Sequence, residues 1–178
     1  MKNFLLSVIS VTLFSACSSA PLPLQVQNEN NLVSFTSVMR SQVADVPLGQ
    51  QARWGGVVVG KLASEDFTEL EIVYAPMRND HSPSKPKAAD LRFKALVKND
   101  SLLSNVDTGA LVTVVGEISN PTVGLINNRT YTYPTIETDT LHVWQRDISD
   151  SNFLDLSSDN KSPWIMVPAW GRNRFERN

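Results

Sequence analysis

The sequence is poor in the residues from which metal and cofactor sites are built. It contains one Cys and two His. A single Cys forms neither an internal disulfide nor a thiolate metal site. His81 is expected to be solvated in a polar, Pro-rich loop, and His142 to pack at a strand end. We therefore expect no metal and no cofactor, which argues against most cofactor-dependent enzymes.

An excess of one charge sign is also lacking. The chain has 16 Lys and Arg against 18 Asp and Glu, a formal net charge of −2. This balance gives no general attraction for nucleic acid, which is not expected as a partner. Hydrophobic residues make up 42% of the 178 positions, so a folded core is expected. The length suits one domain with extensions and is too short for two.

The apolar run at the N-terminus is too short to cross a bilayer. It spans Phe4 to Phe14 without a charge and follows Lys2, whereas a transmembrane helix needs about 20 apolar residues. Its length fits the hydrophobic region of a secretory signal peptide. Residues 1–16 are therefore predicted to be a lipoprotein signal peptide that is removed.

The only Cys follows this run directly. Residues 13–17, Leu-Phe-Ser-Ala-Cys, resemble a bacterial lipobox, in which the cysteine is acylated and becomes the new N-terminus. The alternative is ordinary signal cleavage with Cys17 as an inert apolar residue. The position of Cys17, the length of the run and the uniqueness of the Cys favour lipidation. Ser18, where Asp would favour the inner membrane, resembles an outer-membrane sorting signal.

Two extensions flank the predicted domain. Residues 17–34 hold the acylated cysteine and a stretch rich in Ser, Pro, Asn and Gln, which predicts a flexible tether. Residues 147–178 are predicted to be an irregular C-terminal tail, acidic at first and then basic, with Trp164 and Trp170. Such a tail suits contact with a membrane interface or a partner, or packing over a barrel end, and the last reading is favoured.

Residues 35–146 are predicted to form the folded domain. A short helix is expected within Val33–Val43, after which the apolar period becomes two. Alternating runs separated by Gly, Pro, Asn or Asp occupy residues 53–62, 69–74, 91–97, 112–118 and 130–144. Five or six such strands predict an all-β fold, a small OB-like antiparallel barrel. Gly55, Gly56 and Gly60 lie where a long first strand must coil sharply.

A family resemblance begins in the first strand. Residues 49–56, Gly-Gln-Gln-Ala-Arg-Trp-Gly-Gly, are similar to the opening strand of the Slp family of outer-membrane lipoproteins. The likeness continues through Thr68–Ile72, Val112–Gly116, Gly124–Asn127 and Leu141–Trp144. The family is associated with carbon starvation and stationary phase. The resemblance implies a periplasm-facing domain held to the outer membrane, with no catalytic residues to carry over.

One tripeptide resembles a catalytic motif. Asp107-Thr108-Gly109 also occurs in aspartic proteases, where a homodimer brings two such carboxylates together to share a proton. The same tripeptide is an ordinary turn, in which Asp caps the backbone and Gly takes a positive φ. A loop precedes it here instead of an apolar strand, so the turn is favoured.

A polar constellation on the barrel wall is a second candidate site. Arg53, Glu69, Glu71 and Glu117 supply paired carboxylates and a cation of the kind that glycosidases use. Alternation places all four on the solvent face of their strands. Cross-strand ion pairs there need no function, so a structural role is favoured.

Aromatic platforms for a ligand are a third candidate. OB-like barrels bind oligonucleotides or oligosaccharides on such platforms, and Tyr131, Tyr133 and Trp54 are the aromatic residues in question. A basic groove for nucleic acid is missing beside them. The sequence thus predicts a non-enzymatic outer-membrane lipoprotein with an envelope-supporting or stress-related role, and an envelope protein or glycan as its partner. The alternative is a periplasm-facing binding module for a cell-wall glycan, peptide or small ligand.

Overall fold

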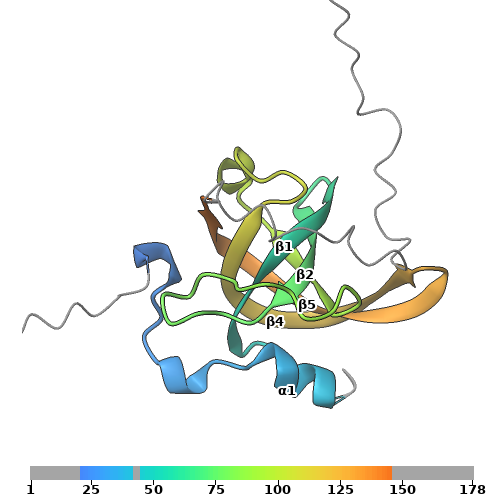
Figure 1. The fold of residues 1–178 in the computed structure, drawn as a ribbon, viewed down its shortest axis with the longest axis horizontal. Helices are drawn as coiled ribbons and strands as arrows, with labels where there is room; N and C mark the ends of the chain where they lie inside the picture. The colour runs from blue at the N-terminus through green and yellow to red at the C-terminus, as the bar shows by residue number, and fades with distance from the viewer. Residues whose placement is uncertain (1–20, 42–44, 146–178) are drawn as a thin grey trace, which may run out of the picture.

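The computed structural model describes residues 21–41 and 45–145 (Figure 1). The predicted signal peptide (1–16), Cys17 and the predicted tail (147–178) lie outside them. The helices are η1 (Leu22–Leu24), η2 (Glu29–Asn31), α1 (Phe35–Arg40) and η3 (Asp100–Leu103). The strands are β1 (Gln51–Ala63), β2 (Thr68–Ala75), β3 (Arg92–Val97), β4 (Leu111–Ile126) and β5 (Arg129–Trp144).

The five strands close into a barrel in the order β1-β2-β3-β5-β4. Neighbouring strands run antiparallel, except that β3 and β5 are parallel. This is the topology of the OB-fold, a five-stranded Greek-key barrel. The prediction of an all-β, OB-like barrel is confirmed, and the helix expected within Val33–Val43 is present as α1.

Alternating residues of every strand fill the barrel interior. Trp54, Ile72 and Phe93 are among the largest of these buried side chains. Phe35 of α1 adds to them, because its ring stacks on Tyr74 with 4.1 Å between ring centroids and meets Trp54 edge-on at 5.5 Å. Burying each such side chain contributes about 1.5–3 kcal/mol. Helix α1 therefore belongs to the same core as the barrel.

The long strand β1 bends at its glycines, as the sequence predicted. A Cβ on Gly56 would collide with the backbone carbonyl of Val73 on β2. The pairing of β1 with β2 shifts between Val58 and Gly60, a β-bulge that adds local twist. Close approach at Gly56 and the bulge at Gly60 allow one strand to pair with both β2 and β4.

Strands β4 and β5 continue beyond the barrel as a two-stranded arm. Figure 1 shows this arm, gold to orange, reaching away from the barrel. Two residues of β4 lie opposite Pro134 alone, a β-bulge at which a proline, lacking an N–H to donate to the ladder, is tolerated. Asn127 and Asn128 close the arm with positive φ angles, as hairpin turns require. Val123 and Leu125, each 68% exposed, lie on the same face of the arm.

The segment expected to be a flexible tether differs from that prediction in residues 21–34, which we call the N-terminal strap. It forms η1 and η2 and lies against the barrel. Leu24 is fully buried, and Val33 makes a parallel bridge to Ala52 of β1. The prediction was wrong for these residues because a few apolar contacts and one ion pair, spaced irregularly, order the strap without a periodic apolar face.

Candidate functional site

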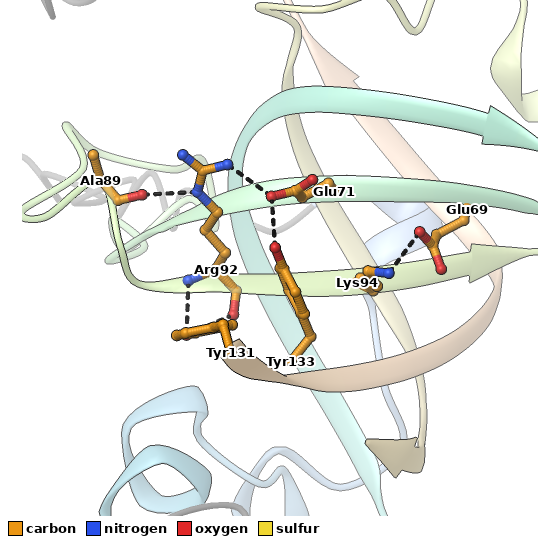
Figure 2. A network of polar contacts seen from close by, with 7 residues as sticks. All are labelled: Glu69, Glu71, Ala89, Arg92, Lys94, Tyr131 and Tyr133. Atoms are coloured by element: carbon orange, nitrogen blue, oxygen red, sulfur yellow. Dashed lines mark hydrogen bonds and ion pairs between the residues drawn. The ribbon is translucent and has the colours of Figure 1, made fainter. Parts of the chain in front are cut away.

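The outer face of β2, β3 and the arm end of β5 carries a network of hydrogen bonds and ion pairs (Figure 2). OB-folds commonly use the face of strands 2 and 3, together with the loop between strands 4 and 5, to hold ligands. Here that face carries the carboxylates Glu69 and Glu71, which the sequence analysis singled out, together with Tyr131 and Tyr133. The fold thus brings parts of two of the predicted candidate sites together.

Glu71 is the centre of this network. Its Oε1 accepts a hydrogen bond from Nη1 of Arg92 at 2.7 Å and another from the hydroxyl of Tyr133 at 3.1 Å. The Nε of Arg92 donates to the carbonyl of Ala89 at 2.9 Å. Three hydrogen bonds within this chain therefore fix the positions of the Arg92 and Glu71 side chains.

A second ion pair lies beside the first. Lys94 Nζ is 2.8 Å from Glu69 Oε1, and the same ammonium lies 4.9 Å from the ring centroid of Tyr133. Each cation of β3 thus meets the carboxylate diagonally across on β2. Such cross-strand pairs contribute roughly 0.2–1 kcal/mol each. The two acids and the two bases on this face cancel in charge.

The two tyrosines of β5 are held within this face rather than presented to solvent. Tyr133 is buried, and its ring meets Tyr131 edge-on at 4.7 Å. The hydroxyl of Tyr131 lies 3.2 Å from both the amide nitrogen and the carbonyl oxygen of Arg92. Burial and the nearby carboxylate of Glu71 raise the pKa of Tyr133, so this phenol stays protonated and donates to Glu71. The tyrosines close the face instead of forming an open stacking platform.

Trp54, the third aromatic candidate, lies inside the barrel. It is buried in the core, and its indole Nε1 donates to the carbonyl of Val33 at 2.9 Å. Strand alternation already placed Trp54 on the face opposite to Arg53. The interpretation of Trp54 as part of a ligand platform is therefore wrong.

Arg53 points outward, as predicted, but it is not on a solvated face. The strap covers it, so that its side chain is only 4% exposed. Its Nη1 donates to Glu29 Oε1 at 2.8 Å and to the carbonyl of Leu24 at 3.0 Å, and its Nη2 forms an ion pair with the other carboxylate oxygen of Glu29. Glu29 is not among the residues predicted from the sequence. The available signal was that Glu29 is the only charged residue between Cys17 and Met39.

Glu117, the remaining residue of the predicted constellation, lies on a different side of the barrel. It pairs across strands with Glu137, whose carboxylate binds Lys98 Nζ at 2.8 Å. Hydrogen bonds from Lys98 and Ser119 hold the pKa of Glu137 below its usual value. Glu117, Glu137 and Lys98 line an open groove of about 460 Å³ between the strap and strands β4 and β5. The constellation is thus split into three separate places.

The protease-like tripeptide is a turn in the structure. Asp107 is exposed, its carbonyl accepts the amide of Ala110 at 2.9 Å, and Gly109 has a φ of 90°. The amide of Gly109 donates to the carbonyl of Val58 at 2.7 Å, which ties the turn to β1. The turn interpretation, which the sequence analysis favoured, describes this geometry.

The two histidines have structural contacts. His81 is half-buried rather than fully solvated, and its carbonyl accepts from the hydroxyl of Thr113 at 2.9 Å. His142 packs edge-on against Trp144 with 4.6 Å between ring centroids. Burial lowers the pKa of both imidazoles. Within residues 21–41 and 45–145, His, Cys, Asp and Glu form no group of three or more that could hold a metal ion.

Fold and site together define a small OB-like barrel protein whose outer β2–β3 face is filled by its own paired side chains. Comparison with known sequences adds the family: the profile of the outer membrane lipoprotein Slp family matches residues 14–171. The chain belongs to this family, as the resemblance implied, and is a lipid-anchored protein of the outer membrane. Across the described part of the chain, helices are too short or too polar to span a bilayer.

Two relatives from Escherichia coli (strain K12) support this assignment. The chain is 26% identical over 162 residues to the outer membrane protein Slp, covering 89% of this chain and 84% of that protein. It is 29% identical over 140 residues to the uncharacterized lipoprotein YeaY, covering 76% of this chain and 70% of that protein.

Solved structures with a similar fold include Rim1, a mitochondrial single-stranded DNA binding protein of S. cerevisiae. The TM-score is 0.36 at 12% identity, covering 56% of this chain and 98% of Rim1. A small single-stranded DNA-binding protein of Streptomyces coelicolor gives a TM-score of 0.33 at 10% identity, covering 57% of this chain and 96% of that one. Likeness at this level carries no argument for nucleic-acid binding.

Proposed function

We propose that this protein is a non-enzymatic scaffold of the outer membrane, acylated at Cys17 after removal of residues 1–16. Its barrel faces the periplasm, and it supports the envelope under stress, including carbon starvation. Acyl chains on Cys17 attach it to the membrane, an envelope protein or glycan is its partner, and nucleic acid is not. Membership of the outer-membrane lipoprotein family supports the anchor.

One observation carries the non-enzymatic part of the proposal. The face that OB-folds use for ligands is filled by the Glu71–Arg92–Tyr133 network and the Glu69–Lys94 pair. A catalytic carboxylate needs room for substrate and an altered proton affinity. Here both carboxylates are bound to cations of the same chain, and a buried tyrosine completes the network. Such a face stabilises the barrel, and few of its polar groups are left unpaired to bind a substrate.

The proposal is tested in the native Gram-negative host. A strain without the gene is complemented with wild-type protein, with Cys17→Ala, or with Asp107→Asn. We expect the deletion and Cys17→Ala strains to admit more of a hydrophobic fluorescent dye in carbon-starved stationary phase, and Asp107→Asn to behave as wild type. A deletion strain that matches wild type in both growth phases contradicts the envelope-supporting role. Loss of function in correctly localised Asp107→Asn contradicts the non-enzymatic role.

The second candidate function is a binding module for a cell-wall glycan, peptide or small ligand. The groove of about 460 Å³ beside Glu117 and Glu137 favours it, because amide and carboxylate groups line the groove. Co-sedimentation of the purified protein with cell-wall sacculi tests this function. Glu117→Gln should weaken co-sedimentation, whereas Glu65→Gln, an exposed carboxylate on the β1–β2 loop, should leave it unchanged. Equal co-sedimentation of the two variants removes the groove from consideration.

A further inference from the structure

The chain between the proposed lipid site and the folded body is short. Four Cα–Cα steps separate Cys17 from Pro21, where the strap begins. A fully extended chain covers at most about 3.6 Å per residue, so these two Cα atoms lie within roughly 14 Å of each other. This bound holds for any conformation of residues 18–20. A flexible tether reaching to residue 34 would instead have placed the start of the barrel roughly 20–25 Å from Cys17.

The strap is fastened to the barrel along its length. Near its start, Leu24 is fully buried and its carbonyl accepts from Arg53. In its middle, Glu29 binds the same guanidinium with both carboxylate oxygens. At its end, the amide of Val33 donates to the carbonyl of Gln51 at 2.9 Å. Lifting the strap would expose Leu24 and leave the buried Arg53 without its counter-ion, so the strap moves with the barrel.

The first half of the strap has the composition of a surface that meets lipid headgroups. Residues 21–28 contain no charged side chain. Leu22 is 82% exposed, between Pro21 and Pro23. An isolated exposed leucine is ordinary on a protein surface, but this one lies within a few residues of the proposed acyl chains. Moving an apolar side chain from water into the headgroup region of the bilayer is favourable in free energy.

We infer that residues 21–28 of the strap are the membrane-facing surface of the barrel, with Leu22 among the lipid headgroups. The inference rests on acylation of Cys17 in the proposed function. The barrel wall beside η1, including Asp139 of β5, then lies close to the bilayer, because Asp139 and Gln25 line the same groove. The β4–β5 arm lies at the other end of the long axis from the start of the strap (Figure 1).

Fluorescence quenching in vesicles tests this orientation on the full acylated protein. The sequence has no Cys besides Cys17, whose sulfur is blocked by the lipid, so an introduced cysteine takes a fluorescent label specifically. Labels are placed at Gln27→Cys on the strap, Asp139→Cys on the barrel and Val123→Cys on the arm. The vesicles contain phosphatidylethanolamine and phosphatidylglycerol with a headgroup spin-labelled lipid as quencher.

We expect severalfold stronger quenching at positions 27 and 139 than at 123. A Gly/Ser spacer of about 17 residues inserted between Ala20 and Pro21 should reduce the quenching at 139, since it restores a reach of roughly 20–25 Å. Equal quenching at 139 and 123 in a chain shown by mass spectrometry to be acylated overturns this inference alone. An unacylated chain that does not float with the vesicles overturns the anchor and this surface together.

Discussion

Arg53 on the outside of β1 and Glu29 in the N-terminal strap form a two-pronged ion pair, with 2.8 Å between Nη1 and Oε1. The arginine side chain is 4% exposed and the glutamate side chain 53%. One partner is therefore desolvated while the other still meets water. This pair joins the segment nearest the proposed lipid site to the first strand of the barrel, and two predictions rest on it.

Glu29→Gln should destabilise the protein by about 1–2 kcal/mol, less than the 3–5 kcal/mol of a fully buried pair, because Glu29 is half-exposed. The substitution destabilises the folded state because Arg53 stays buried while its counter-ion is replaced by a neutral amide. Urea unfolding followed by circular dichroism measures the change in the free energy of unfolding. Glu65→Gln is the matched control and should stay within about 0.5 kcal/mol of wild type. Equal effects of the two substitutions would show that the ion pair does not fasten the strap.

The same pair predicts a pH dependence of stability. Hydrogen bonds from Arg53 lower the pKa of Glu29 from its usual 4.5. A carboxyl with a depressed folded-state pKa binds fewer protons when folded, so its contribution is complete above the unfolded-state pKa and is lost as the pH falls through the folded-state pKa. Thermal unfolding from neutral to acidic pH should show wild type losing its advantage over Glu29→Gln below about pH 4.5. An advantage that stays constant down to strongly acidic pH contradicts this assignment.

Gly56→Ala should destabilise the barrel by about 3 kcal/mol or more, since the new methyl group meets the Val73 carbonyl and the strands must separate. Gly60→Ala is the control, because its nearest neighbour, Glu71 Cβ, would lie 3.3 Å away, a far milder contact than the one at Gly56. Melting temperatures of the two variants provide the comparison. Similar melting temperatures would mean that close strand approach at Gly56 does not shape the barrel.

The barrel could be predicted because its signals are local. Apolar alternation marks the inner face of each strand, and Gly56 and Gly60 stand at the close approach and the bulge of β1. The strap could not be predicted in this way. Its order depends on one buried leucine, one ion pair and backbone contacts to β1 far along the chain, and none of these produces a periodic pattern.

In the candidate site, too, local patterns could be predicted and contacts between distant segments could not. Alternation correctly placed Glu69 and Glu71 on the outer face, and paired carboxylates suggested chemistry. Their partners come from β3 and β5, namely Lys94 for Glu69 and both Arg92 and Tyr133 for Glu71, and only the order β2-β3-β5 around the barrel brings them together. Arg53 was expected on a solvated face because strand alternation carries no information about a segment folding over it.

Asp107→Asn should change stability by about 1 kcal/mol or less, because the side chain is exposed and the turn is held by backbone hydrogen bonds. Envelope function should be retained. Urea unfolding and the dye-permeability assay on the same variant measure both properties. A stable, correctly localised variant without function would restore the catalytic interpretation of the tripeptide.

Acylation at Cys17 is the central claim, and mass spectrometry of the N-terminal peptide of protein taken from native outer membranes tests it most directly. The account predicts that the mature chain starts at Cys17 and that this residue carries a diacylglyceryl group and an N-acyl chain. An unmodified chain that starts at any other residue would contradict the anchor, the scaffold role built on it and the membrane-facing strap.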